Sequence, residues 1–161
     1  MSSFHEYVAS SGTMTIDSET QNPRHGAASR ALSDSATVSI IHVDDDPQMG
    51  PLVNDMLERA DPRFEVFETS HPAEVLQWCR TETIACVISD YDMPNCDGIT
   101  LSETITSEFP HIPVIMFSSY RPNDVDVNIE HTPVNDWIQK GAHTQWKRLI
   151  TSIQGHTNYE P

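Results

Sequence analysis

Basic side chains are scarce in this sequence. Lysine and arginine together number 9, against 24 aspartates and glutamates, and the formal net charge is −15 over 161 residues. A negative field of this size repels the phosphates of nucleic acids, and no basic stripe compensates for it. The composition therefore argues against direct binding to nucleic acid, and it favours a well-hydrated, acidic surface.

Long hydrophobic runs are also missing. Apolar stretches such as "VSII" and "PVIMF" are far too short to cross a bilayer. The first residues, "MSSFHEYVASSG", have neither the basic start nor the continuous apolar core of a secretory signal. We therefore expect no membrane insertion and a location in the cytoplasm.

Cysteine and histidine show no pattern typical of a metal site or a redox site. The 3 cysteines form no CxxC pair, and Cys79 and Cys86 lie in apolar segments where they are expected to be buried. The 8 histidines form no HExxH motif and no Cys/His ligand spacing. Only His42, in "SIIHVDDD", lies near other chemically interesting residues, and we expect it to be a packing residue.

The composition divides the chain into a tail and one domain. Residues 1–36 contain eleven serines and threonines and few large apolar side chains, so they cannot bury enough surface to offset their ordering entropy. We predict a disordered N-terminal tail over 1–36, a single domain over 37–155 and a short C-terminal tail over 156–161.

Strand-like and helical segments alternate along the predicted domain. The strand-like segments are "TVSIIHV", "FEVFE", "IACVIS", "IPVIMF" and the weaker "NDWIQ". Helical apolar spacing marks "PLVNDMLERA", "PAEVLQWCR", "GITLSETITSEF" and "TQWKRLITSI", and the first of these places Leu52, Val53, Met56, Leu57 and Ala60 on one face. Strands that are apolar on both faces predict a doubly wound α/β fold, with a five-stranded parallel sheet and helices on both sides.

One segment departs from this alternation. The stretch "RPNDVDVNIEHTP" stands where a fourth helix is expected, but it combines β-branched residues, Asn, Asp and two prolines. These residues disfavour a helix, and no apolar stripe runs through them. We therefore predict a short or irregular fourth helix.

Polar residues follow four of the predicted strands. The first is followed by Asp44–Asp46, the third by Asp90, the fourth by Ser118 and Ser119, and the fifth by Lys140. In open parallel sheets, ligands bind beyond the carboxyl ends of the strands. The sequence therefore predicts that carboxylates, a hydroxyl and an amine meet in one crevice.

Such a set of groups has a definite chemistry. Carboxylates held close together repel one another unless a cation lies between them, and hard oxygen ligands suit Mg²⁺. The hydroxyl of Ser118 can donate to a phosphoryl oxygen, and the ammonium of Lys140 can neutralise another. Asp90 then becomes a candidate nucleophile that forms an aspartyl phosphate.

Each residue also has a simpler interpretation when it is taken alone. The acidic run after the first strand can favour a helix dipole, Asp90 can end a strand, Ser118 can cap a helix, and Lys140 can be solvated. The chain has only two lysines, Lys140 and Lys147, and one of them falls where the site needs a cation. One common site therefore explains the four strand ends better than four separate coincidences.

The stretches "VDDDP", "SDYDMPNCDG", "PVIMFSS" and "WIQKG" resemble the receiver domain of two-component response regulators, of the chemotaxis-regulator type. The resemblance extends over residues 38 to about 154. It implies a flavodoxin-like fold with the strand order 2-1-3-4-5.

The resemblance also implies which residues react and which hold a metal. By similarity, Asp90 is the phosphoacceptor. Asp44 and Asp45 hold Mg²⁺, together with the backbone carbonyl of Asp92. Asp90 contributes to the same metal site.

Further roles carry over in the same way. Ser118 is the switch hydroxyl that moves toward the phosphoryl group, and Lys140 contacts that group. Trp137 matches an aromatic whose rotamer reports activation, although a core aromatic is an equally good interpretation. Gly141 stands where the family usually has proline, so the loop after Lys140 departs from the pattern.

The implied function is signalling rather than catalysis on an external substrate. We expect the phosphoryl group to come from a sensor histidine kinase or a phosphotransfer protein, with self-dephosphorylation as the only turnover. After Lys140 only 21 residues remain, so we expect a stand-alone receiver that acts by contact with a downstream protein or by phosphorelay.

Two alternatives remain. One is an adaptor with a receiver fold that works through protein–protein interaction without phosphorylation. The other is a phosphatase of the haloacid dehalogenase type, suggested by "DYD". The second is disfavoured because only 71 residues follow Asp90.

Overall fold

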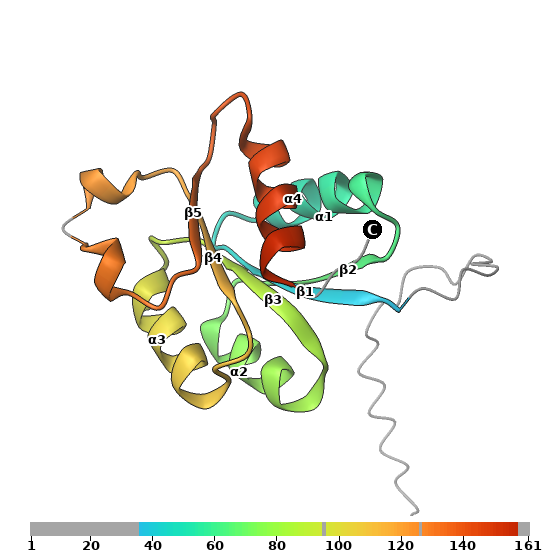
Figure 1. Cartoon of the computed structure of the whole chain (residues 1–161), viewed down its shortest axis with the longest axis horizontal. Helices are drawn as coiled ribbons and strands as arrows, with labels where there is room; N and C mark the ends of the chain where they lie inside the picture. Colours follow the sequence, from blue (N-terminus) through green and yellow to red (C-terminus); the bar gives the residue numbers. More distant parts are fainter. Residues whose placement is uncertain (1–35, 95, 126, 158–161) are drawn as a thin grey trace, which may run out of the picture. The chain divides into compact units, whose positions relative to one another are not determined.

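The structure is a computed structural model that describes residues 36–94, 96–125 and 127–157. Its centre is a parallel sheet of five strands in the order β2-β1-β3-β4-β5 (Figure 1). The strands are β1 (Val38–Val43), β2 (Phe64–Thr69), β3 (Ile84–Ser89), β4 (Val114–Ser118) and β5 (Asp136–Gln139). The predicted parallel sheet and its order are thus confirmed.

In the described part of the chain, four α-helices cover the sheet. They are α1 (Met49–Ala60), α2 (Pro72–Thr81), α3 (Gly98–Glu108) and α4 (Gln145–His156). Figure 1 shows α1 and α4 on one face of the sheet and α2 and α3 on the other. This arrangement confirms the flavodoxin-like, doubly wound fold.

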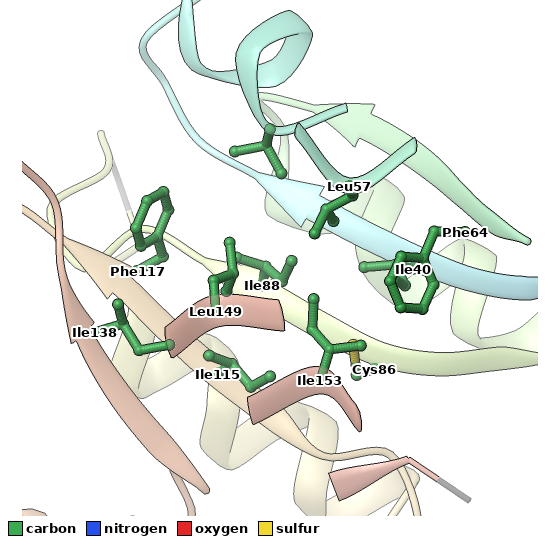
Figure 2. Packing of buried hydrophobic residues seen from close by; sticks show 11 residues of the cluster. Ile40, Leu57, Phe64, Cys86, Ile88, Ile115, Phe117, Ile138, Leu149 and Ile153 are labelled. Carbon is green, nitrogen blue, oxygen red and sulfur yellow. The ribbon is translucent and has the colours of Figure 1, made fainter. Parts of the chain in front are cut away.

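Alternate residues of β1 supply the two halves of the core. Ile40 packs toward α1 and α4, and Ile41 packs toward α2 and α3. Figure 2 shows the first of these clusters, in which side chains from the strands meet Leu57 of α1 and Leu149 and Ile153 of α4. Because both faces of the strand are buried, the strand reads as a continuous apolar run, as parallel sheets require.

The buried stripe of α1 is narrower than the sequence suggests. Val53 and Leu57 are fully buried, whereas Leu52 is 44% exposed. Leu52 lies one position, about 100°, further round the helix than Val53, and the sheet covers only one stripe. Of the five residues predicted to share one face of this helix, Leu52 and Ala60 are therefore exposed, and the core covers only part of that face.

The Asp97–Gly98 pair begins α3. The side chain of Asp97 caps α3 by accepting a hydrogen bond from the backbone N of Thr100 at 2.8 Å. The backbone N of Gly98 donates to the carbonyl of Tyr91 at 2.8 Å. These bonds tie the start of α3 to the loop that follows β3.

The connection from β4 to β5 has the predicted irregular form. Between β4 and β5, where the sequence predicts a short or irregular helix, the described residues form two 3₁₀ turns, Pro122–Asp124 and Ile129–His131. The tail predicted over 1–36 lies outside the described residues except for its last residue. Helix α4 ends at His156, one residue beyond the predicted domain boundary, and 158–161 lie outside the described residues.

Candidate functional site

The sheet brings the predicted polar residues to one edge because its hydrogen bonding continues just past the strands. The backbone N of Asp44 donates to the carbonyl of Thr69 at 3.1 Å, and that of Asp90 donates to the carbonyl of Val43 at 2.9 Å. The backbone N of Lys140 donates to the carbonyl of Ser118 at 2.7 Å. The strand ends are therefore held in register, and the side chains that follow them meet.

Three carboxylates form the centre of this site. One oxygen atom from each of Asp44, Asp45 and Asp90 lies within 4.8 Å of the other two. Asp44 and Asp90 are buried and Asp45 is exposed, so the cluster opens to solvent on one side. Together with Asp92, these residues line a pocket of about 440 Å³.

Lys140 neutralises the buried part of the cluster. Its Nζ donates to Oδ2 of Asp44 at 2.6 Å and to Oδ1 of Asp90 at 3.0 Å. Its side chain is 13% exposed, against 2% for Asp44 and 10% for Asp90. Burial raises the pKa of Asp90, and the Lys140 ammonium partly offsets this shift. The Lys140 ammonium therefore offsets part of the free-energy cost of burying the two carboxylates.

Ser118 closes the site from β4. Its side chain is buried at the end of the strand, and its Oγ accepts a hydrogen bond from the backbone N of Tyr120 at 3.2 Å. Ser119 and Tyr120 line the pocket, but Ser118 does not. The hydroxyl therefore lies behind the residues that line the pocket, and it accepts a hydrogen bond from the backbone of the loop that follows β4.

Trp137 is buried near the same loop. It is 7% exposed, and its Nε1 donates to the carbonyl of Tyr120 at 2.8 Å. The ring centroid of Tyr91, the residue after Asp90, lies 5.5 Å from the ring centroid of Trp137. Ser118 and Trp137 thus hold the backbone of Tyr120 from its two sides, at the N–H and at the carbonyl.

His42, expected from the sequence to be a packing residue, is buried beside the site. It is 1% exposed, and its Nε2 has no hydrogen-bond partner in the described part of the chain. That atom lies 3.7 Å from Oδ2 of Asp44, which is too far for a hydrogen bond. Burial, with a smaller effect of Lys140, lowers the pKa of His42 to about 3. The imidazole is therefore neutral at physiological pH.

Gly141 gives the loop after Lys140 a conformation that suits glycine. Its φ is +80°, and the peptide bonds of the described residues are all trans. A Cβ at this position would meet no atom within 4 Å, so only the backbone conformation resists a side chain.

We expect Gly141→Ala to lower the free energy of unfolding by about 1 kcal/mol, the usual cost of a left-handed residue with a Cβ. Urea denaturation measures this change. Gly141→Asn is the matched control, because asparagine tolerates the left-handed region, and it should cost less. Equal losses for the two variants would contradict the explanation.

The donor set fits Mg²⁺. All three grouped side chains offer carboxylate oxygens, which are the hard ligands that Mg²⁺ prefers, and the ion needs only one or two of them directly. Lys140 pairs with Asp44 and Asp90 but not with Asp45, so the cluster of three carboxylates carries more negative charge than this ammonium neutralises, and added positive charge is favoured.

The family comparison agrees with this geometry. Residues 40–154 match the family model described as the response regulator receiver domain. The chain belongs to the response regulator receiver family. Members of this family act in two-component systems, are typically phosphorylated on an aspartate, and bind Mg²⁺ at an acidic pocket.

Curated relatives of this receiver are longer proteins. The phosphoglycerate transport system transcriptional regulatory protein PgtA of Salmonella typhimurium is 28% identical over 102 residues, which are 63% of this chain and 24% of that protein. The response regulator UvrY of Escherichia coli is 23% identical over 117 residues, 73% of this chain and 53% of that protein. This chain thus spans about a quarter to a half of the length of these two relatives.

Solved structures support the fold. A response regulator receiver domain protein from Clostridium thermocellum has a TM-score of 0.66 at 22% identity, over 75% of this chain and 94% of that one. The response regulator TrrA from Thermotoga maritima, solved in complex with Mg²⁺-BeF, has a TM-score of 0.63 at 19% identity, over 73% of this chain and 99% of that one. Within the described ranges, no helix is both long and apolar enough to cross a membrane.

Proposed function

We propose that this receiver accepts a phosphoryl group on Asp90. The observation that carries the proposal is the position of Lys140, whose Nζ bridges Asp44 and Asp90 at the wall of an open acidic pocket. A lysine buried between two carboxylates adds little net stability, because all three groups lose hydration. The same ammonium is well placed to contact an incoming anion.

The donor is a phosphohistidine of a sensor histidine kinase or of a phosphotransfer protein. One carboxylate oxygen of Asp90 attacks phosphorus, and a P–O bond forms. The P–N bond to the donor imidazole breaks, and its electron pair stays on the donor nitrogen. The reaction needs in-line access to Asp90, which the pocket beside the carboxylate supplies.

Asp44 and Asp45 hold Mg²⁺, with Asp90 and the backbone carbonyl of Asp92 as further ligands. When bound, Mg²⁺ neutralises charge that the carboxylates and the phosphoryl oxygens would otherwise bring together.

Lys140 turns from Asp44 toward a phosphoryl oxygen. The hydroxyl of Ser118 turns from the backbone N of Tyr120 to donate to another. The indole of Trp137 donates a hydrogen bond to the carbonyl of Tyr120, so Trp137 responds when Ser118 releases the backbone N of that residue. The protein acts as a phosphorylation switch with slow self-dephosphorylation, and it has no external substrate.

The phosphorylated form signals through contact with a downstream protein or passes the group on in a phosphorelay, in the cytoplasm. Signalling without DNA contact agrees with the net charge of −15.

Intact mass after incubation with acetyl phosphate and Mg²⁺ tests the phosphoacceptor. We expect the wild type to gain the mass of one phosphoryl group, and we expect Asp90→Asn and the wild type in excess EDTA to gain none. Asp97→Asn is the matched control, because it makes the same isosteric change nearby, and asparagine also caps a helix. It should be labelled like the wild type.

The second candidate function is an adaptor that binds its partner without phosphorylation. The observation that favours it is the pair of 3₁₀ turns, Pro122–Asp124 and Ile129–His131, in place of a full helix between β4 and β5. An unlabelled wild type with a native circular dichroism spectrum would support the adaptor and overturn phosphorylation at Asp90.

A further inference from the structure

We propose that His42 is a positioning residue, which holds Asp44 by a hydrogen bond from Nε2 whenever Lys140 releases that carboxylate. The inference rests on the proposed function, because it assumes that Lys140 turns to the phosphoryl group. It concerns the metal-bearing carboxylate and gives a role to a histidine that the phosphorylation chemistry does not otherwise use.

The first observation is an unpartnered polar atom in the core. His42 lies in β1, where its neighbours in register are Glu68 on β2 and Ile88 on β3. Among the described residues, only Nε2 of His42 and Oγ of Ser152 are buried side-chain atoms without a hydrogen-bond partner. A buried donor or acceptor left unpaired is costly, so its presence calls for an explanation.

The second observation is where this atom points. Nε2 of His42 lies 3.7 Å from Oδ2 of Asp44, the same oxygen that accepts from Lys140 at 2.6 Å. The other oxygen of Asp44 already accepts from the backbone N of Asp46 at 2.9 Å. The oxygen that faces His42 is therefore the one that loses its partner when Lys140 moves.

The third point is that the replacement bond is within reach. A shift of about 0.8 Å would bring the two atoms to the usual N–H···O distance of about 2.9 Å. An imidazole donates from Nε2 in the tautomer that a facing carboxylate favours. Carboxylates that bind metals are commonly held by such outer hydrogen bonds, which fix their orientation.

A simple packing role predicts a different behaviour. If His42 only filled space beneath α1, an apolar side chain of similar size would serve equally well in every state of the site. If His42 holds Asp44, the effect of replacing His42 depends on whether Lys140 still pairs with that carboxylate. The two roles are therefore separated by measuring His42 variants with Lys140 present and with Lys140 removed.

The test compares His42→Leu, which loses the donor, with His42→Gln, whose amide keeps one. In excess beryllofluoride, a phosphoryl mimic, Mg²⁺ is titrated and the tryptophan fluorescence is followed. We expect the Mg²⁺ midpoint to rise about 10-fold or more in His42→Leu, in line with the loss of an outer-sphere hydrogen bond. We expect His42→Gln to stay within about threefold of the wild type, because it retains the donor.

Thermal unfolding without metal supplies an independent readout. In EDTA, we expect His42→Leu to melt at the same temperature as the wild type or higher, because it removes an unpaired polar atom. In a Lys140→Met background, we expect the same change to lower the melting temperature, because Asp44 then depends on His42. A double-mutant cycle isolates this coupling.

The outcomes separate the two proposals. A wild type that responds to Mg²⁺ and beryllofluoride, together with a His42→Leu midpoint like that of the wild type and no coupling to Lys140, overturns the role of His42 and leaves phosphorylation intact. A wild type that does not respond at all overturns the proposed function, and the role of His42 with it.

Discussion

Lys140→Met is expected to lower the free energy of unfolding by about 3 kcal/mol in the absence of divalent metal. The change removes the ammonium that donates to Asp44 at 2.6 Å and to Asp90 at 3.0 Å, and it leaves two carboxylates buried against each other. Breaking a buried ion pair by removing one partner typically costs about 3–5 kcal/mol. We take the lower end because the pocket opens to solvent beside Asp45.

Urea denaturation in EDTA measures this loss, and the chain contains its own control. Lys147, the second of the two lysines, is exposed on α4, so Lys147→Met should change stability by no more than about 0.5 kcal/mol. A loss of the same size in both variants would show that Lys140 does not stabilise the carboxylates.

Mg²⁺ should narrow the gap between Lys140→Met and the wild type. A ligand that binds only the folded state adds about 2.7 kcal/mol at a hundredfold excess over its dissociation constant. In the variant, no ammonium competes with the ion for Asp44 and Asp90, so its affinity for Mg²⁺ should be higher than that of the wild type. Repeating the denaturation at saturating Mg²⁺ checks this, and an unchanged gap would contradict it.

The fold and the site were largely predictable from the sequence because parallel strands have a simple signature. Buried strands appear as apolar runs, and a polar residue directly after such a run marks the strand's carboxyl end. Asp44, Asp90 and Lys140 were placed in this way, and the structure brings them into direct contact. The rest of the domain follows from the alternation of strands and helices.

Other features could not be predicted because they depend on tertiary distances. His42 lies in an apolar run, and nothing in the run shows that its Nε2 would be 3.7 Å from a carboxylate and otherwise unpaired. The exposure of Leu52 could not be predicted because helical periodicity gives the direction of an apolar face but not the width of the surface that covers it. The hydrogen bond from Trp137 to the carbonyl of Tyr120 depends on how the connection after β4 folds back toward β5.

The start of α3 lies very close to the main chain at the carboxyl end of β3, so a side chain added there should have a large effect. A Cβ built at Gly98 would lie 2.3 Å from the backbone carbonyl oxygen of Asp90 and 2.7 Å from Sδ of Met116. The methionine side chain can move aside, but the carbonyl belongs to the main chain of Asp90, the proposed phosphoacceptor. Gly98→Ala should therefore lower the free energy of unfolding by about 2 kcal/mol, which is within the usual range for overpacking a buried position.

Gly155→Ala is the matched control for this prediction. Gly155 lies near the end of α4, where an added Cβ would meet nothing within 4 Å, so alanine should raise stability by about 0.5 kcal/mol through its better helix propensity. The midpoints of urea denaturation, at an unchanged slope, give both values.

Gly98→Ala should also slow labelling by acetyl phosphate, because relief of the contact displaces the main chain of Asp90. If the two glycines tolerate alanine equally, then Gly98 does not lie against the Asp90 carbonyl in solution, and it has no steric role in placing Asp90.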